Sequence, residues 1–190
     1  MRVLHVSSDC GHGGVETMLA ALIREQRKSG IEADAYFLVD QGGVGHYENL
    51  CKVMFAKTHS LMQVLLTGGY DLIHATSYVS EWVRRASARS FYPGSIVVSC
   101  HSFGAYTPGL RSDAVTAVSA AIAESIRDRC PHPVTVVYNG VDTERFYPPQ
   151  SSKASGKPIM AWVGRSGDGV KDYAGLTAVA LSNAAREFQV

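Results

Sequence analysis

The N-terminal part of the sequence combines a short apolar run, a glycine-rich turn and an amphipathic helix, in that order. Residues 3–6 predict a buried strand, residues 11–14 (Gly-His-Gly-Gly) form the turn, and apolar side chains spaced by three and four residues follow it. Glycines let a ligand approach the backbone, and the free N–H groups and dipole of a helix N-terminus attract anions. The turn therefore predicts a phosphate site, or alternatively a simple connection between strand and helix.

The spacing of these glycines differs from that of two common nucleotide-binding motifs. A dinucleotide fingerprint, GxGxxG, that began at Gly11 would require glycine where the chain has Glu16. The turn also lacks the GK[ST] ending of a P-loop. Both observations argue against an NAD-dependent enzyme and a Walker-type NTPase.

Strand and helix patterns alternate along the next part of the chain. Further strands are predicted at residues 33–39, 52–56, 71–75, 95–100, 114–118 and 134–138. Helices are predicted at 60–66 and 79–90, and a further helix is expected to begin at Ser119 as its N-cap. This alternation predicts an α/β fold, a Rossmann-like doubly wound parallel sheet with helices on both faces.

The composition changes at residue 148. Residues 148–157 are rich in proline and serine and predict a linker, which makes residues 1–147 the first domain. Residues 158–190 then predict one strand, one loop and one helix. A single strand and helix cannot bury their apolar faces alone, so we expect them to be the incomplete start of a second Rossmann-like domain.

Charge and cysteine content restrict the class of partner and the compartment. The 190 residues have a net charge of +1 without a dense basic run, so nucleic acid is not expected as a partner. The spacing of Cys10, Cys51, Cys100 and Cys130 forms no zinc or redox motif, which favours a cytoplasmic protein. We expect neither a signal peptide nor a transmembrane segment, because no apolar run approaches the required ~20 residues.

Peripheral contact with the inner face of a membrane is left open. Arg84, Arg85 and Arg89 fall in one predicted helix and could face anionic lipid. A solvated helix face is the simpler interpretation of the same residues. The sequence alone favours the solvated face.

Ligands of open parallel sheets bind beyond the carboxyl ends of the strands. His101 directly follows the strand predicted at 95–100 and is the better candidate of the histidines. His74, in the strand predicted at 71–75, either contacts a ligand or bonds a neighbouring segment, whereas His5 is expected to be a satisfied core residue. Ser102 and Phe103 follow His101 and are possible contacts of the same ligand. The loops 42–47 and 103–111 also leave the ends of strands and carry glycine with aromatic residues.

Several segments together resemble family four of the retaining glycosyltransferases, also called glycosyl transferases group 1. The resemblance runs in order over essentially the whole chain, and the last two segments are the most specific. The segments are MRVLHVSS, GGVET, YDLIHATS, VVSCHSFG, AVTAVS, VVYNGVDTERFYP and IMAWVGR with its downstream lysine.

The resemblance implies a GT-B architecture, in which this chain supplies the acceptor-side domain and the first part of the donor domain. It implies a nucleoside-diphosphate sugar as donor, with Gly13 and Gly14 near the diphosphate and His101 as the catalytic residue beside the sugar. Arg165 and Lys171 correspond to the cations that hold the diphosphate and stabilise its developing charge. It implies neither a metal nor a cofactor.

For an enzyme of this kind, His74, Ser102 and Phe103 are possible acceptor or sugar contacts. We expect the loops 42–47 and 103–111 to shape the acceptor site.

Members of the family continue for another domain of ~150 residues, which carries the carboxylates that hold the ribose and the sugar. We therefore expect the 190-residue chain alone to be inactive. An alternative is a non-catalytic module that binds carbohydrate or a partner, and an NAD-dependent enzyme is less favoured. The sequence leaves open the donor sugar and base, the acceptor, the oligomeric state, and whether the chain is naturally this short.

Overall fold

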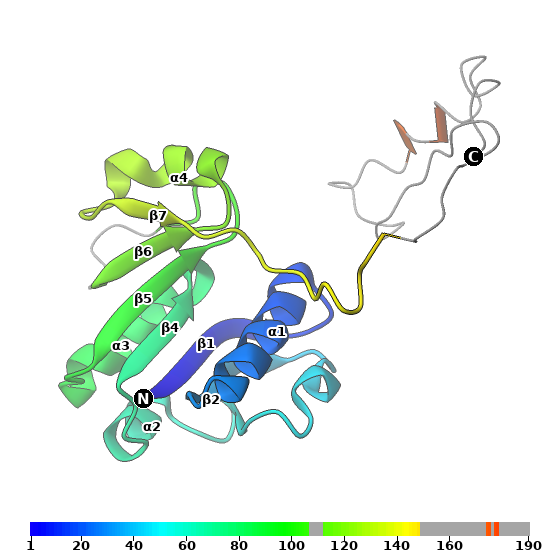
Figure 1. Cartoon of the computed structure of the whole chain (residues 1–190). Helices are drawn as coiled ribbons and strands as arrows, with labels where there is room; N and C mark the ends of the chain where they lie inside the picture. Colours follow the sequence, from blue (N-terminus) through cyan, green and yellow to red (C-terminus); the bar gives the residue numbers. More distant parts are fainter. Residues whose placement is uncertain (107–111, 149–173, 176, 179–190) are drawn as a thin grey trace. The chain divides into compact units, whose positions relative to one another are not determined.

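The computed structural model describes residues 1–106, 112–148, 174–175 and 177–178 (Figure 1). The chain divides into two compact units, Met1–Asp142 and Thr143–Val190. All elements named below belong to the first unit. Most of the expected linker and of the expected second-domain start lies outside the described residues, as do Arg165 and Lys171.

The described part of the first unit contains a seven-stranded sheet of order β3-β2-β1-β4-β5-β6-β7, in which every pair is parallel. This confirms the predicted fold class. The strands are β1 (Arg2–Cys10), β2 (Glu32–Asp40), β3 (Val53–Phe55), β4 (Leu72–Thr76), β5 (Ser95–Cys100), β6 (Ala114–Ala117) and β7 (Val134–Val136).

Helices cover the two faces of the sheet unevenly. Helix α1 (Gly14–Lys28) packs on one face over β1 and β2 (Figure 1). Helices α2 (Leu61–Thr67), α3 (Ser80–Ser90) and α4 (Ala120–Ile126) contribute to the core on the other face. In the described ranges, no helix has the length and apolar character needed to span a bilayer.

Among the residues that the structure describes, the first unit also contains three short 3₁₀ turns, namely η1 (Val44–Tyr47), η2 (Ser77–Val79) and η3 (Arg127–Arg129). The sequence analysis expected residues 42–47 to shape the acceptor site. In the structure Tyr47 is instead fully buried against Phe37, and its hydroxyl donates to the Glu16 carbonyl at 3.0 Å. Tyr47 is therefore part of the core beneath α1 and is not exposed to a ligand.

Strand β1 extends beyond the apolar run that predicted it. It continues through Ser7 and Asp9 to Cys10, because these residues pair with β2 in register: Ser7 with Phe37 and Asp9 with Val39. The polar carboxyl end of β1 is therefore held by main-chain pairing with its neighbour. The turn begins only where this pairing ends.

Two helix ends show how local sequence sets the boundaries. Ser119 caps α4 as expected, and its Oγ accepts a hydrogen bond from the Ile122 N–H at 3.2 Å. Helix α3 ends at Ser90, and its C-cap residue, Phe91, has a φ of 49° and a side chain that is 91% exposed. The left-handed backbone conformation is sterically unfavourable for any residue with a Cβ atom, so Phe91 occupies a position that favours glycine.

We predict that Phe91→Gly raises the free energy of unfolding by about 1 kcal/mol, because glycine adopts the left-handed conformation without steric cost. The exposed ring contributes little packing that could be lost. Urea denaturation measures the change, and Phe91→Ala is the matched control that keeps the strain. Equal stabilities of the two variants would contradict the explanation.

Candidate functional site

The order of the strands reverses between β1 and β4. From β1 the sheet grows to β2 and β3 on one side, and to β4, β5, β6 and β7 on the other. Ligands of open α/β sheets bind at such a point, outside the carboxyl ends of the strands. Here the glycine turn (residues 11–14) follows β1, η2 follows β4, and residues 101–106 follow β5. These segments form the candidate site.

One side of the glycine turn is already occupied by a carboxylate. Gly13 is the N-cap of α1 with extended backbone, and the Glu16 side chain lies where a Cβ on Gly13 would project. Glu16 is only 7% exposed. Gly14, by contrast, is exposed and nothing lies within 4 Å of the position of its Cβ. A ligand can therefore approach the turn over Gly14.

The loop after β2 fixes the position of the turn. The Gly43 N–H donates to the Cys10 carbonyl at 2.8 Å, and Gly43 packs so closely on the Gly11 backbone that a side chain would collide. The imidazoles of His12 and His46 lie 3.1 Å apart, from Nδ1 to Nε2. The turn is thus shaped by contacts with a second loop as well as by its own glycines.

The electrostatic surroundings of the turn are negative. Burial raises the pKa of the Cys10 thiol to about 11, and the carboxylates of Asp40, Glu16 and Asp9 add to the rise. A diphosphate at this turn therefore needs cations from elsewhere to offset the repulsion. The two cations that the resemblance assigns to this role lie outside the described residues.

A row of hydrogen-bonded side chains crosses the sheet from α1 to β6. Gln26 Oε1 lies 2.7 Å from His5 Nε2, and His5 Nδ1 lies 2.8 Å from His74 Nδ1. His74 Nε2 lies 2.6 Å from Ser99 Oγ, which lies 2.8 Å from Thr116 Oγ1. With the amide oxygen of Gln26 as acceptor, His5 donates from Nε2. His5 Nδ1 then accepts from His74 Nδ1–H, and His74 Nε2 accepts from the Ser99 hydroxyl. We call these five side chains the histidine row.

Both imidazoles of the histidine row are neutral. Burial lowers the pKa of His5 to about 4. Burial, with contributions from His5 and His101, lowers the pKa of His74 to about 3. A proton added to His5 Nδ1 would also place two N–H groups against each other, and one added to His74 Nε2 would require the Ser99 hydroxyl to change from donor to acceptor. His5 is a buried histidine with both ring nitrogens hydrogen-bonded, as expected. Both ring nitrogens of His74 are also hydrogen-bonded within the row, which agrees with the alternative that His74 bonds neighbouring segments.

His101 differs from the other two histidines because its Nε2 atom is buried without a hydrogen-bond partner in the described part of the protein. Burial lowers the pKa of His101, which favours the neutral ring. Buried polar atoms are nearly always hydrogen-bonded, so this nitrogen is available to a ligand. His101 is therefore the strongest candidate residue of the site.

The residues after His101 belong to the same region. Ser102 shares a hydrogen bond with the hydroxyl of Tyr78 from η2, and the Phe103 side chain is 72% exposed. The sequence analysis named Ser102 and Phe103 but missed Tyr78. Its position three residues after the strand predicted at 71–75 was the available signal. Residues 107–111 of the expected acceptor loop lie outside the described residues.

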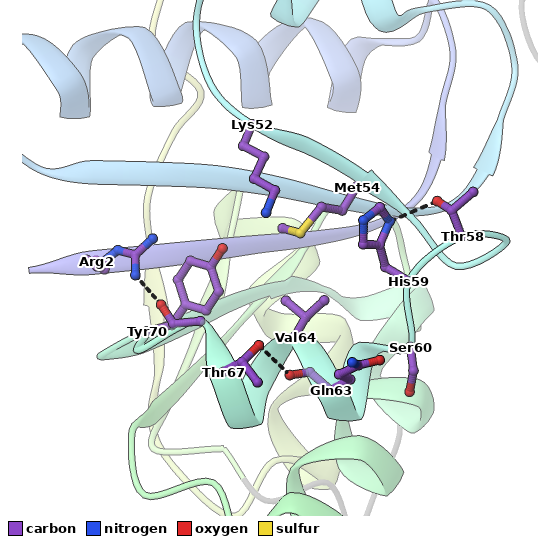
Figure 2. Close-up of a pocket in the computed structure, with 11 residues that line it drawn as sticks. Arg2, Lys52, Met54, Thr58, His59, Ser60, Gln63, Val64, Thr67 and Tyr70 are labelled. Atoms are coloured by element: carbon purple, nitrogen blue, oxygen red, sulfur yellow. Dashed lines mark hydrogen bonds between the residues drawn. The ribbon is translucent and has the colours of Figure 1, made fainter.

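A hollow of about 430 Å³ lies elsewhere on the first unit. Arg2, Lys52 and Tyr70, which line it, stand at the amino ends of β1, β3 and β4, and Figure 2 shows the Lys52 amine directed into it. Arg2 is partly neutralised by Glu32 and Asp34. None of the predicted site residues lines this hollow, so it is separate from the candidate site. In the described ranges no group of three or more His, Cys, Asp or Glu side chains is placed to hold a metal ion.

Comparison with known families agrees with this geometry. Residues 12–145 match the model described as Glycosyltransferase Family 4, and this match covers more than half of the chain. The chain belongs to glycosyltransferase family 4. The resemblance found in the sequence is thereby confirmed, and residues 12–14 of the glycine turn, His101 and the carboxyl ends of β2 to β7 lie within the matched region. A search among curated proteins found no significant sequence match.

Two solved structures share the fold of this family 4 chain. One is described as an alpha-glucosyltransferase in complex with UDP and a 13-mer DNA containing a HMU base, with 13% identity and a TM-score of 0.55. The other is an alpha-glucosyltransferase in complex with UDP-glucose and DNA containing an abasic site, with 13% identity and a TM-score of 0.52. Each match covers 76% of this chain and 44% of the other. The chain thus spans less than half the length of these glycosyltransferases.

We predict that the free energy of unfolding of the family 4 chain decreases as the pH is lowered, because of the histidine row. Unfolded histidines bind protons below pH 6.5, whereas the folded state resists protonation down to about 4 at His5 and about 3 at His74. The unfolded state therefore binds more protons as the pH falls from 6.5 to 4. The free energy of unfolding should drop by up to about 1.4 kcal/mol per pH unit for each histidine.

Urea denaturation at a series of pH values measures this slope, and the double variant His5→Gln with His74→Gln should flatten it. If the double variant does not fold, the ring resonances of the wild-type histidines provide the test. Titration of both rings at pH 6.5 would contradict the assignment.

We also predict that Glu16→Gln strengthens binding of inorganic pyrophosphate at the glycine turn by about tenfold or more, because it removes a buried negative charge beside Gly13. Amide shifts of residues 11–17 during NMR titration report the affinity. Glu25→Gln, which removes an exposed charge near the other end of α1, is the control and should have little effect. Equal affinities of wild type and Glu16→Gln would show that Glu16 does not restrict the turn.

Proposed function

We propose that this chain forms the acceptor-side domain of a retaining glycosyltransferase that uses a nucleoside-diphosphate sugar. The family match supports the reaction class, and the neutral His101 with its unpartnered Nε2 supports the location. That nitrogen is the observation on which the proposal chiefly depends. It provides a buried hydrogen-bonding atom at the carboxyl edge, where a sugar hydroxyl can be bound.

In this proposal each part of the site has a separate task. The backbone at Gly14 approaches the donor diphosphate, and Arg165 and Lys171 balance the charge that builds on the leaving group. His101 hydrogen-bonds the donor sugar. The acceptor hydroxyl attacks the anomeric carbon from the same face from which the leaving group departs, so the anomeric configuration is retained. The departing phosphate takes the proton of that hydroxyl.

The acceptor in our proposal is a small molecule, a glycan or a lipid-linked sugar. The DNA in the two related structures belongs to those proteins, and likeness at 13% identity concerns the fold. The net charge of +1 on this chain provides no general attraction for nucleic acid. A cytoplasmic location and independence of metal remain expectations from the sequence and the resemblance.

The test uses the protein encoded by the complete reading frame that contains these residues. We predict that His101→Ala lowers the rate of nucleoside diphosphate release from its preferred sugar nucleotide by about a hundredfold or more. The donor is found first by a screen of UDP-, GDP- and ADP-sugars. His132→Ala, which removes an exposed histidine before β7, is the matched control and should retain full activity.

Unchanged activity of His101→Ala would remove that residue from the mechanism. A second pair of variants, Arg165→Ala and Lys171→Ala, tests the diphosphate assignment separately, and each should raise KM for the donor. If no sugar nucleotide is turned over by wild type, the catalytic proposal fails and the binding-module alternative gains support.

A further inference from the structure

Helices α2 and α3 expose several large apolar side chains on the face of the sheet away from α1. Met62 and Leu66 of α2, Tyr78 of η2 and Trp82 of α3 are between 38% and 61% exposed. A soluble surface seldom gathers such residues without a binding role. Together with Arg85 and Arg89 we call them the α2–α3 surface.

The spacing of these residues brings them together. Trp82, Arg85 and Arg89 follow one another at intervals of three and four residues, which places them along one stripe of α3. Tyr78 of η2, just before α3, lines the same groove. Helix α2 packs against α3, so that Met62 lies beside this stripe. An open groove of about 620 Å³ runs between them and is lined by Met62, Trp82, Arg85 and Arg89, among others.

The charge of the α2–α3 surface is positive. Helix α3 carries three arginines and one glutamate, whereas α2 has no charged residue. Hydrogen bonds from Arg84 and Arg85 lower the pKa of Glu81 to about 2, so its carboxylate stays ionised and shared between the two guanidinium groups. Arg89 adds a further positive charge to the stripe. The excess of cations beside aromatic rings is complementary to an anionic surface.

We propose that the α2–α3 surface docks on an anionic lipid membrane. Tryptophan and tyrosine favour the boundary between headgroups and acyl chains, and arginine stems reach along apolar surface to lipid phosphates. Stable protein interfaces use about 20 residues or more on each side. The few residues of this surface are too small a patch for such an interface, but they suffice for partial insertion in a bilayer.

The α2–α3 surface borders the candidate site. The Tyr78 hydroxyl shares a hydrogen bond with Ser102, which directly follows His101. A bilayer at this surface therefore lies next to the segment after β5. The docking proposal does not depend on the proposed enzymatic activity, because it follows from exposure and charge alone.

The test is co-sedimentation of the 190-residue chain with two kinds of vesicle. We predict binding to vesicles of phosphatidylcholine mixed with phosphatidylglycerol, and little binding to phosphatidylcholine alone. Sodium chloride should weaken this binding by screening the arginines. The chain has two tryptophans, so Trp162→Phe leaves Trp82 as the single reporter, whose emission should shift to the blue on binding.

Two variants locate the contact. Trp82→Ala should lower the partition coefficient by about tenfold. Arg85→Glu with Arg89→Glu should lower it by more than about tenfold, since each basic residue near an anionic surface contributes about fivefold. Arg24→Glu with Lys28→Glu makes the same charge change on exposed positions of α1, on the other face of the sheet, and should leave binding unchanged.

The proposal would be overturned by no binding to either kind of vesicle or by equal binding to both. Equal losses of vesicle binding in the test and control variants would also overturn it, as would arginine-dependent binding of duplex DNA without binding of lipid. Self-association that disappears with Trp82→Ala in the absence of lipid would also overturn it and assign the surface to a second copy of the chain. Because no sugar nucleotide is present in these assays, failure of lipid binding leaves the proposed transfer reaction separately testable.

Discussion

The reversal of strand order between β1 and β4 determines where everything else in the first unit lies. Because all described strands are parallel, their carboxyl ends meet at one edge, and the reversal sends α1 to one face while α3 and α4 pack on the other. The segments after β1, β4 and β5 are thereby brought to the same edge. The glycine turn, Tyr78 and His101 come from distant parts of the sequence and are brought to one edge, where they form the candidate site.

The histidine row connects this topology to the position of α1. A parallel sheet is ordinarily apolar on a helix-covered face, yet this face carries His5, His74, Ser99 and Thr116 in hydrogen-bonded contact. Gln26 extends the row into α1. A satisfied polar network in a buried environment specifies one arrangement, because displacement of any member leaves others unpaired. The row therefore fixes the helix on the sheet more specifically than apolar contacts alone.

The sequence predicted the strands and the main helices because their signals are local. Apolar runs and turns marked every strand of the sheet, and Ser119 was recognised as a cap from its own type and position. It did not predict the carboxyl end of β1, since Ser7 to Cys10 become strand only by pairing with β2. The packing of Glu16 against Gly13 and the burial of Tyr47 were also missed, because both depend on contacts between segments. The position of His101 at the carboxyl edge could be predicted because it directly follows a strand, whereas its role stays a prediction.

The contact of Gly43 with Cys10 and Gly11 makes the geometry of the glycine turn depend on a segment that is synthesised later. Residues 11–14 leave the ribosome well before Gly43, and the hydrogen bond that holds the turn requires the later loop. A nascent chain that has formed only the first strand and helix thus possesses the glycines without their final geometry. The glycine turn can therefore reach its final geometry only after the second strand and the loop that follows it have been synthesised.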